Sequence, residues 1–188
     1  MERSAAERVA SIQPSPVAGR FYRHAAINRD PLAGGIGQRW GKNFPVIYVG
    51  RPEQAPVAEA YRHLVEAAGV PAHAVKARIL YTVRVTVQQV LDLTDPEYAE
   101  AVGLTGADFH SEVGDYDRCQ AIGAAAHQLG FHGVLAPAAH AMGETLAIFK
   151  ERIAASELPV VEHELLWSEL PVDPRVTSPR TLRSVESK

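Results

Sequence analysis

The sequence predicts a mixed α+β fold whose strands are mostly not joined by regular βαβ units. The alternating run "ARILYTVRVTVQQVLDLTD" (77–95) predicts a long half-buried strand, and the alanine-rich run "DYDRCQAIGAAAHQLGFHG" (115–133) predicts a tightly packed helix. The chain has 188 residues, of which 46% are hydrophobic and 22% are charged. These values are typical of one globular domain with a sizeable core.

The first third of the chain is expected to contain two strands separated by a loop. Residues 1–18 are mostly polar, and we expect a short helix or arm ahead of the domain. "GRFYRHAA" (19–26) alternates and predicts the first strand, and "FPVIYVG" (44–50) predicts the second. The glycine-rich "NRDPLAGGIGQRWGKN" (28–43) between them predicts a loop.

Helices and short strands are expected in the remaining chain. One helix opens at residues 52–53 and stops at Gly69, with Glu59 near the edge of its buried stripe. Asp95 followed by Pro96 predicts the start of another helix. "GVLAPAA" (133–139) and "GETLAIFKE" (143–151) predict two short strands. We therefore expect a domain over 19–165 and a tail over 166–188, with about the last ten residues mobile.

Composition excludes several classes of protein. The formal net charge of −3 gives no reason to expect direct binding to nucleic acid. No apolar run approaches the roughly 20 residues that span a membrane, and the N-terminal stretch lacks the apolar segment of a secretory signal. The single Cys119 cannot form an internal disulfide, which fits a reducing compartment. We expect a cytoplasmic protein.

The usual motifs for cofactors and metals are absent. "GGIGQRW" contains one Gly-x-Gly but lacks the third glycine and the following helix of a dinucleotide fingerprint. The eight histidines show no metal-binding spacing, so we expect them at the surface or in the core, with no metal and no resident cofactor. Cys119 fits a small packed helix residue better than a nucleophile, because nothing nearby indicates an activating base.

Arginines gather around the glycine-rich loop, although the chain as a whole is acidic. Arg20, Arg23, Arg29 and Arg39 lie within twenty residues of one another. Arginine forks bind phosphate, and glycines let backbone N–H groups approach it, so an anion site is one interpretation. A solvated rim is the other. Glu59 similarly fits either a solvated helical residue or a catalytic carboxylate.

Together these segments resemble the RES domain, the toxin half of Xre–RES toxin–antitoxin pairs. "FYRHAAINRDPLAGG" resembles the family's early aromatic-Tyr-Arg motif, and "GQRWGKNFPVIYVG" its Gly-Gly-Arg-Trp-Asn motif with the strand that follows. "APVAEAYRHL" matches an Ala-x-x-Glu helix, and "VLDLTDPEYAEAVGL" a Leu-Asp-Leu-Thr segment. The helix at 115–133, with the "VLAPAA" that follows, resembles a glutamine-containing helix leading to Pro-Ser-Ala. The resemblance extends from about Gly19 to Val161.

The resemblance implies an ADP-ribosyltransferase-like fold with mixed and antiparallel sheets, and an enzyme that releases nicotinamide from NAD⁺ by hydrolysis or phosphorolysis. It assigns catalysis to Glu59, Arg39 and Tyr48. Substrate-binding positions are then Arg23, Tyr22, Trp40, Arg29, Ala138, Thr145 and Gln120. NAD⁺ is a substrate here and not a cofactor. An Xre-type antitoxin is the implied partner, and the chain could form a homo-oligomer.

Four positions depart from the family pattern. Gln38 and Gly41 replace the usual Gly and Asn around the Arg-Trp pair, Ala138 replaces Ser, and Thr145 replaces Asn. These differences leave two alternatives to NAD⁺ cleavage. One is an enzyme of the same fold acting on another nucleotide or a biosynthetic intermediate. The other is a weakly catalytic binding module of a toxin–antitoxin complex.

Overall fold

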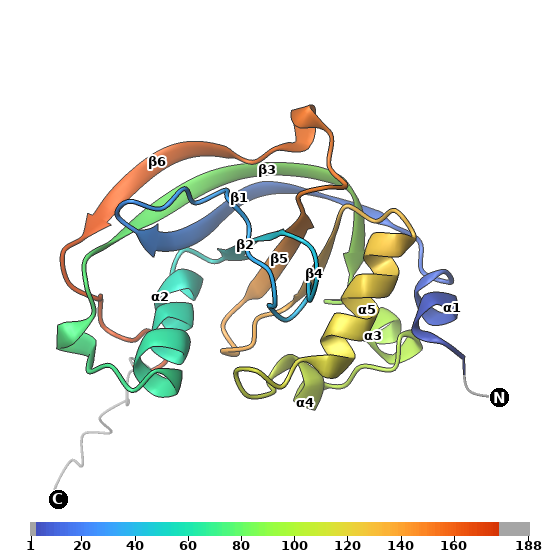
Figure 1. Cartoon of the computed structure of the whole chain (residues 1–188), viewed down its shortest axis with the longest axis horizontal. Coiled ribbons are helices and arrows are strands. Elements are labelled where there is room, and N and C mark those ends of the chain that lie inside the picture. The colour runs from blue at the N-terminus through green and yellow to red at the C-terminus, as the bar shows by residue number, and fades with distance from the viewer. Residues whose placement is uncertain (1–2, 177–188) are drawn as a thin grey trace, which may run out of the picture.

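The structure is a computed structural model that describes residues 3–176. Six strands and a set of mostly short helices alternate along it (Figure 1). The strands are β1 (Ser15–Ala26), β2 (Val46–Arg51), β3 (Arg78–Asp92), β4 (Gly133–Pro137), β5 (Glu144–Phe149) and β6 (Val160–Trp167). The α-helices are α1 (Ala5–Val9), α2 (Ala55–Ala60), α3 (Pro96–Ala101), α4 (Gly106–Phe109) and α5 (Asp117–Gln128). Shorter helical segments are η1 (Tyr61–Ala67), η2 (Ala72–Ala74) and η3 (Ala155–Glu157).

The sheet closes into a barrel. Its strand order is β1-β2-β5-β4-β3-β6. In addition, β3 pairs with β1 along the full twelve-residue length of β1, which completes the ring. On its other edge β3 pairs with β6 over residues 78–84 and with β4 over residues 90–92. Among the strand pairs of residues 3–176, only β3–β4 is parallel. The predicted mixed α+β class is confirmed, whereas the barrel closure was not expected.

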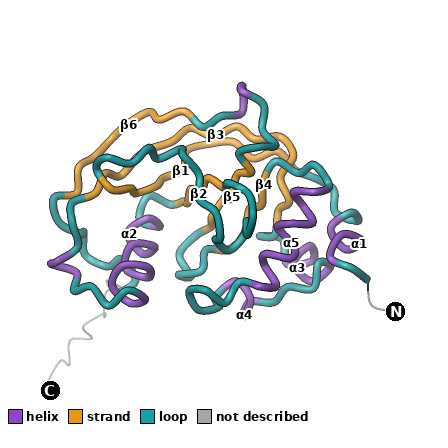
Figure 2. The backbone as a smooth tube through the Cα atoms, viewed as in Figure 1, coloured by secondary structure: helices purple, strands orange, loops and turns teal. Residues whose placement is uncertain are grey.

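The helices form two groups on opposite sides of the short strands β2, β4 and β5 (Figure 1). One group is α2 with η1, and the other contains α1, α3, α4 and α5. The curved strands β1, β3 and β6 run above both groups, and long loops connect the elements (Figure 2). Elements that are far apart in the sequence therefore lie on the two sides of these short strands.

The helix predicted from residue 52 begins slightly later and changes its geometry part-way. Residues 52–54 form a turn in which Ala55 N donates to Pro52 O at 2.9 Å, so regular α-helix begins at Ala55. From Tyr61 to Ala67 the wider π-helical pattern continues the same segment, up to Gly69 with its positive φ of 68°. Such π-helical turns are frequent at functional sites.

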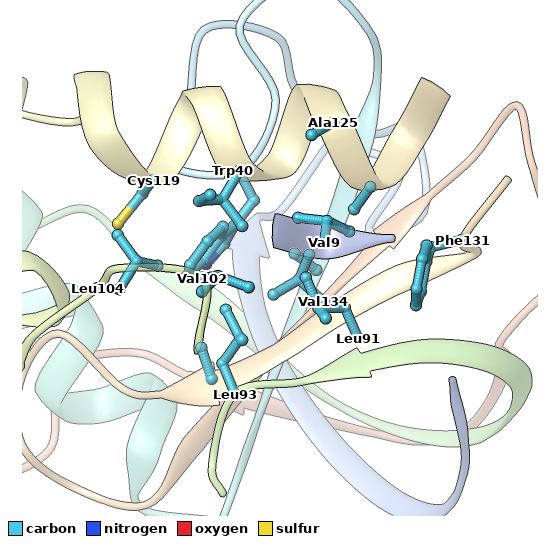
Figure 3. Packing of buried hydrophobic residues seen from close by; sticks show 14 of the residues in the cluster. Val9, Trp40, Leu91, Leu93, Val102, Leu104, Cys119, Ala125, Phe131 and Val134 are labelled. Carbon is cyan, nitrogen blue, oxygen red and sulfur yellow. The ribbon is translucent and has the colours of Figure 1, made fainter. Parts of the chain in front are cut away.

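The main core lies between α5 and the sheet, and Trp40 fills its centre (Figure 3). Trp40 is 1% exposed although it belongs to a loop. A Cβ built on Gly123 of α5 would lie 2.2 Å from Trp40 O, so only glycine lets the helix approach this closely. Val9 of α1 belongs to the same core. The Arg-Trp loop is therefore clamped against α5.

The two ends of the chain contribute more structure than expected. β1 starts at Ser15, so the boundary expected between residues 18 and 19 falls inside this strand. β6 and the short α4 were not predicted. On both faces of β6 most side chains are exposed, so the strand lacks the alternation of buried and exposed residues that would have predicted it. The boundary expected after residue 165 falls inside β6, and the final ten residues lie outside the described part.

No helix in residues 3–176 is both long and apolar enough to cross a membrane.

Candidate functional site

A cleft of about 380 Å³ opens between α2–η1, β1, the 34–40 loop and the turn after β4. This volume is within the range of small-molecule sites. Eight of the ten predicted site residues line it: Tyr22, Arg23, Arg29, Arg39, Trp40, Tyr48, Glu59 and Thr145. The other two, Ala138 and Gln120, do not. The structure therefore brings together residues that are up to 123 positions apart in the chain, from Tyr22 to Thr145.

Among the described residues that line the cleft, Glu59 is the only one with a carboxylate. It projects from the last turn of α2, and its side chain is 40% exposed. His63 Nε2 lies 2.9 Å from Glu59 Oε1, and His140 Nε2 lies 3.7 Å from Oε2. Desolvation opposes ionisation, but the hydrogen bond from His63 and the charges of the neighbouring histidines outweigh it and lower the pKa of Glu59 to about 2. The carboxylate is ionised at neutral pH.

Three histidines from three separate elements surround this carboxylate: His24 of β1, His63 of η1 and His140 of the β4–β5 turn. His140 is buried, with its side chain 2% exposed. Burial, helped by the Arg78 charge, lowers the pKa of His24 to about 3. The sequence reasoning treated all histidines as surface or core residues and missed this arrangement. Only the i,i+4 spacing of Glu59 and His63 gave a local signal.

No group of three or more His, Cys, Asp or Glu side chains in residues 3–176 could hold a metal ion.

Arg39 is hydrogen-bonded to residues 108–111, at the end of α4 and just after it. Its Nη1 donates to Asp108 O at 2.6 Å and to Ser111 Oγ at 2.9 Å, and its Nη2 donates to Ser111 O at 3.0 Å. The guanidinium also lies over the Tyr116 ring, 4.7 Å from its centroid. Arg39 thus lines the cleft, but both its terminal nitrogens already have protein acceptors.

Tyr48 connects the second strand to the clamped loop. Its hydroxyl accepts a hydrogen bond from Trp40 N at 2.9 Å. Burial raises the pKa of Tyr48, so the phenol stays protonated. Because the hydroxyl oxygen is the acceptor in this bond, the hydroxyl hydrogen can still be donated to a ligand in the cleft.

The cleft is strongly basic. Besides Arg23, Arg29 and Arg39, its lining includes Arg62 and Arg78, which the sequence reasoning did not select. Arg62 Nη2 donates to Ser111 O at 2.6 Å. Five arginines therefore face a single carboxylate in a protein whose overall charge is −3. Such a local excess of positive charge attracts anionic ligands.

One of the departures from the family pattern, Gly41, has a local explanation. A Cβ at Gly41 would lie 2.3 Å from Val46 Cγ2, so the asparagine usual in the family does not fit this backbone. Ala138 is fully buried, and its N donates to Gly143 O at 3.0 Å within the β4–β5 turn. Gln120 Nε2 donates to Gln38 O at 3.1 Å and so supports the Arg-Trp loop.

Comparison with known proteins decides the family. Residues 13–168 match the family model of the RES domain. This chain is a RES-domain protein. It is 35% identical over 144 residues to proteins named NAD(+) phosphorylase MbcT from Mycobacterium tuberculosis and Mycobacterium bovis, which covers 73% of this chain and 76% of those proteins. The crystal structure of the M. tuberculosis MbcT–MbcA toxin–antitoxin complex matches with a TM-score of 0.76 at 30% identity, covering 89% of this chain and 93% of that one.

The RES resemblance found in the sequence motifs is thereby confirmed. In this RES-domain protein the Arg-Tyr-Glu residues selected from the motifs do meet in one cleft. The roles of the two arginines differ from what the motifs imply. Arg39 donates its hydrogen bonds to residues 108–111, whereas Arg23 Nη1 has no hydrogen-bond partner among the described residues.

Proposed function

We propose that this protein cleaves the nicotinamide–ribose bond of NAD⁺ and transfers the ADP-ribosyl group to inorganic phosphate. The observation that carries the proposal is the ionised Glu59 in an arginine-lined cleft. Membership of the RES family supports it, as do the relatives named NAD(+) phosphorylase. The dianionic diphosphate of the dinucleotide and a free phosphate both suit the excess of positive charge.

The reaction needs stabilisation of positive charge on the ribose. As the C1′–N bond breaks, its electron pair goes to the nicotinamide nitrogen, which becomes neutral, and the ribose acquires oxocarbenium character. A phosphate oxygen then forms the new bond to C1′. A carboxylate that is already ionised and held by His63 stabilises this transition state without reorganising. Glu59 therefore provides the electrostatic contribution, either to C1′ or to a ribose hydroxyl.

The other cleft residues bind and orient the dinucleotide. Arg23 offers its guanidinium to phosphate oxygens, and the Tyr48 hydroxyl faces or hydrogen-bonds the nicotinamide. Tyr22 and Thr145 also line the cleft. Arg39 keeps the loop and the 108–111 turn in place and contributes positive potential. An ADP-ribosyltransferase-like relationship of the fold and a cytoplasmic location belong to the same proposal.

We also propose that the protein acts as a toxin held in check by an antitoxin partner. The support is the toxin–antitoxin complex containing the structurally similar MbcT. Blocking access to the cleft is the simplest way for such a partner to prevent NAD⁺ loss.

The test is nicotinamide release from NAD⁺ by the purified protein, with and without phosphate. Glu59→Gln keeps the size of the side chain and removes its charge, so we expect a fall of at least about 100-fold in kcat. Glu53→Gln, at an exposed position just before the same helix, is the matched control and should keep full activity. Equal rates for Glu59→Gln and the wild type would contradict the assigned role.

The same assay separates the alternatives. Release that is independent of phosphate would indicate hydrolysis. Absence of release, combined with a rise in melting temperature on adding another nucleotide, would favour a different substrate. Absence of both would favour a binding module of a toxin–antitoxin complex.

A further inference from the structure

Arginines inside and outside the cleft differ in their partners. Outside the cleft, Arg20 and Arg84 pair with Glu162, Arg51 with Glu144, Arg118 with Asp108, and Arg175 with Asp173 and Glu66. Within residues 3–176, none of the five cleft arginines pairs with a carboxylate. The cleft thus holds positive charge that the protein itself does not neutralise.

Two of the five are nevertheless occupied. Arg39 and Arg62 both donate to the Ser111 backbone carbonyl, and Arg39 also bonds the Ser111 hydroxyl and Asp108 O. These bonds fix the 108–111 turn against the cleft wall. They leave Arg23, Arg29 and Arg78 as the cleft arginines whose terminal nitrogens have no acceptor in the described part of the chain.

Arg23 shows this most clearly. Its Nη1 is buried and has no hydrogen-bond partner among the described residues. Burial lowers the pKa of Arg23, and the nearby Arg29 charge lowers it further. An unpaired buried guanidinium nitrogen is costly, so a ligand that supplies an acceptor there gains binding energy.

Arg78 is held in a fixed orientation by an uncharged histidine. Its Nε donates to His24 Nδ1 at 2.6 Å, and the His24 ring stacks on Trp167 with centroids 6.0 Å apart. Because His24 stays neutral, it can accept this bond at physiological pH. The Nη1 and Nη2 groups of Arg78 have no acceptor among residues 3–176 and can form a fork toward an anion.

Arg29 lies close enough to both of the others to influence them. Its charge lowers the pKa of Arg78, after the larger effect of burial, as it does that of Arg23. Arg23 and Arg78 are partly buried and Arg29 is exposed, and three like charges that repel one another along one cleft are stabilised by a multiply charged anion. Asp30 is a carboxylate among the described residues whose charge partly offsets this effect on Arg23, and its Oδ1 accepts a hydrogen bond from Leu32 N at 2.8 Å.

We propose that Arg23, Arg29 and Arg78 form a binding site for a phosphate group, with His24 as the residue that positions Arg78. The assignment rests on the proposed function for the source of that group, which is either the inorganic phosphate acceptor or the diphosphate of the dinucleotide. Arg78, with His24 behind it, is the new member of the site, since the sequence motifs select Arg23 and Arg29 but not Arg78.

Steady-state kinetics with Arg78→Gln and Arg29→Gln test the site and identify its ligand. A hydrogen bond to a charged group contributes about 1.5–3 kcal/mol, so we expect a KM increase of about 10- to 100-fold in each variant. An increase confined to phosphate assigns the site to the acceptor, and one confined to NAD⁺ assigns it to the diphosphate. Unchanged KM values for both substrates overturn the proposal. Arg84→Gln, on the exposed part of the same strand as Arg78, is the matched control.

A binding measurement keeps the site testable without turnover. In phosphate-free buffer, inorganic phosphate or pyrophosphate should raise the melting temperature of the wild type and of Arg84→Gln by mass action, and should raise it much less for Arg78→Gln. The melting temperature of each variant without ligand checks its folding. Stabilisation of the wild type without NAD⁺ cleavage would refute the proposed function and leave the site standing. No stabilisation of the wild type by either anion, or equal stabilisation of Arg78→Gln, refutes the site.

Discussion

Gly123 lets α5 touch the backbone of the Arg-Trp loop, and Gly123→Ala should disturb both stability and catalysis. The new Cβ would lie 2.2 Å from Trp40 O and 2.9 Å from Trp40 C, whereas ordinary contacts begin near 3.4 Å. The loop or the helix must therefore move by about 1 Å. Overpacking of this kind costs about 1–3 kcal/mol of unfolding free energy. The shift also moves Trp40 N, which donates to the Tyr48 hydroxyl.

The assay combines denaturant unfolding with nicotinamide release. A displacement of about 1 Å at a catalytic group can reduce the rate about 100-fold, so we expect kcat to fall by about 10- to 100-fold at temperatures where Gly123→Ala is folded. Gly106→Ala is the matched control, because a Cβ there meets nothing within 4 Å. Wild-type stability together with wild-type kcat for Gly123→Ala would refute the argument that this contact positions the loop.

Two further predictions concern the histidines around Glu59. His63→Leu removes the hydrogen bond to Glu59 Oε1, so the pKa of Glu59 should rise by about 1–2 and kcat should fall about 10- to 100-fold. The pKa is measured by ¹³C NMR of the carboxylate and kcat by nicotinamide release, and His63→Gln should restore part of the rate. An unchanged pKa of Glu59 in His63→Leu would exclude the bond. His24 has a folded pKa of about 3, below the ordinary 6.5, so the unfolded chain takes up its proton first and stability is lost as pH falls below 6.5. In urea unfolding, the free energy of unfolding of the wild type should therefore decrease by about 2 kcal/mol more than that of His24→Phe between pH 6.5 and pH 5. The same pH dependence in both proteins would show that His24 is not buried in its neutral form.

Local patterns in the sequence predicted most of the secondary structure. The alternation at 78–92 identified β3, the Asp95-Pro96 pair identified the start of α3, and the alanine-rich run identified α5. Such patterns suffice because periodicity and capping depend on residues that are neighbours in the chain. β6 was missed because its side chains are exposed on both faces, and barrel closure was missed because β1–β3 pairing joins segments some sixty residues apart.

The candidate site divides in the same way. Ordered motifs were enough to select Arg23, Tyr48 and Glu59, and to recognise the RES family. The motifs could not assign partners, since a hydrogen bond or an uncompensated charge depends on which side chains the fold brings within a few ångströms. The partners of Arg39 lie about seventy residues away from it in the sequence.

By itself, the sequence determined the mixed α+β class and the family, and it selected candidate side chains for an anionic nucleotide, because these follow from residue types and their local order. Tertiary structure alone decided that Arg39 donates to the 108–111 segment, whereas the terminal nitrogens of Arg78 have no acceptor in the described part of the chain. It also decided that histidines from three elements surround Glu59. Electrostatic interactions act through space, so their balance at this cleft is established only when the barrel closes and the helices pack beside it.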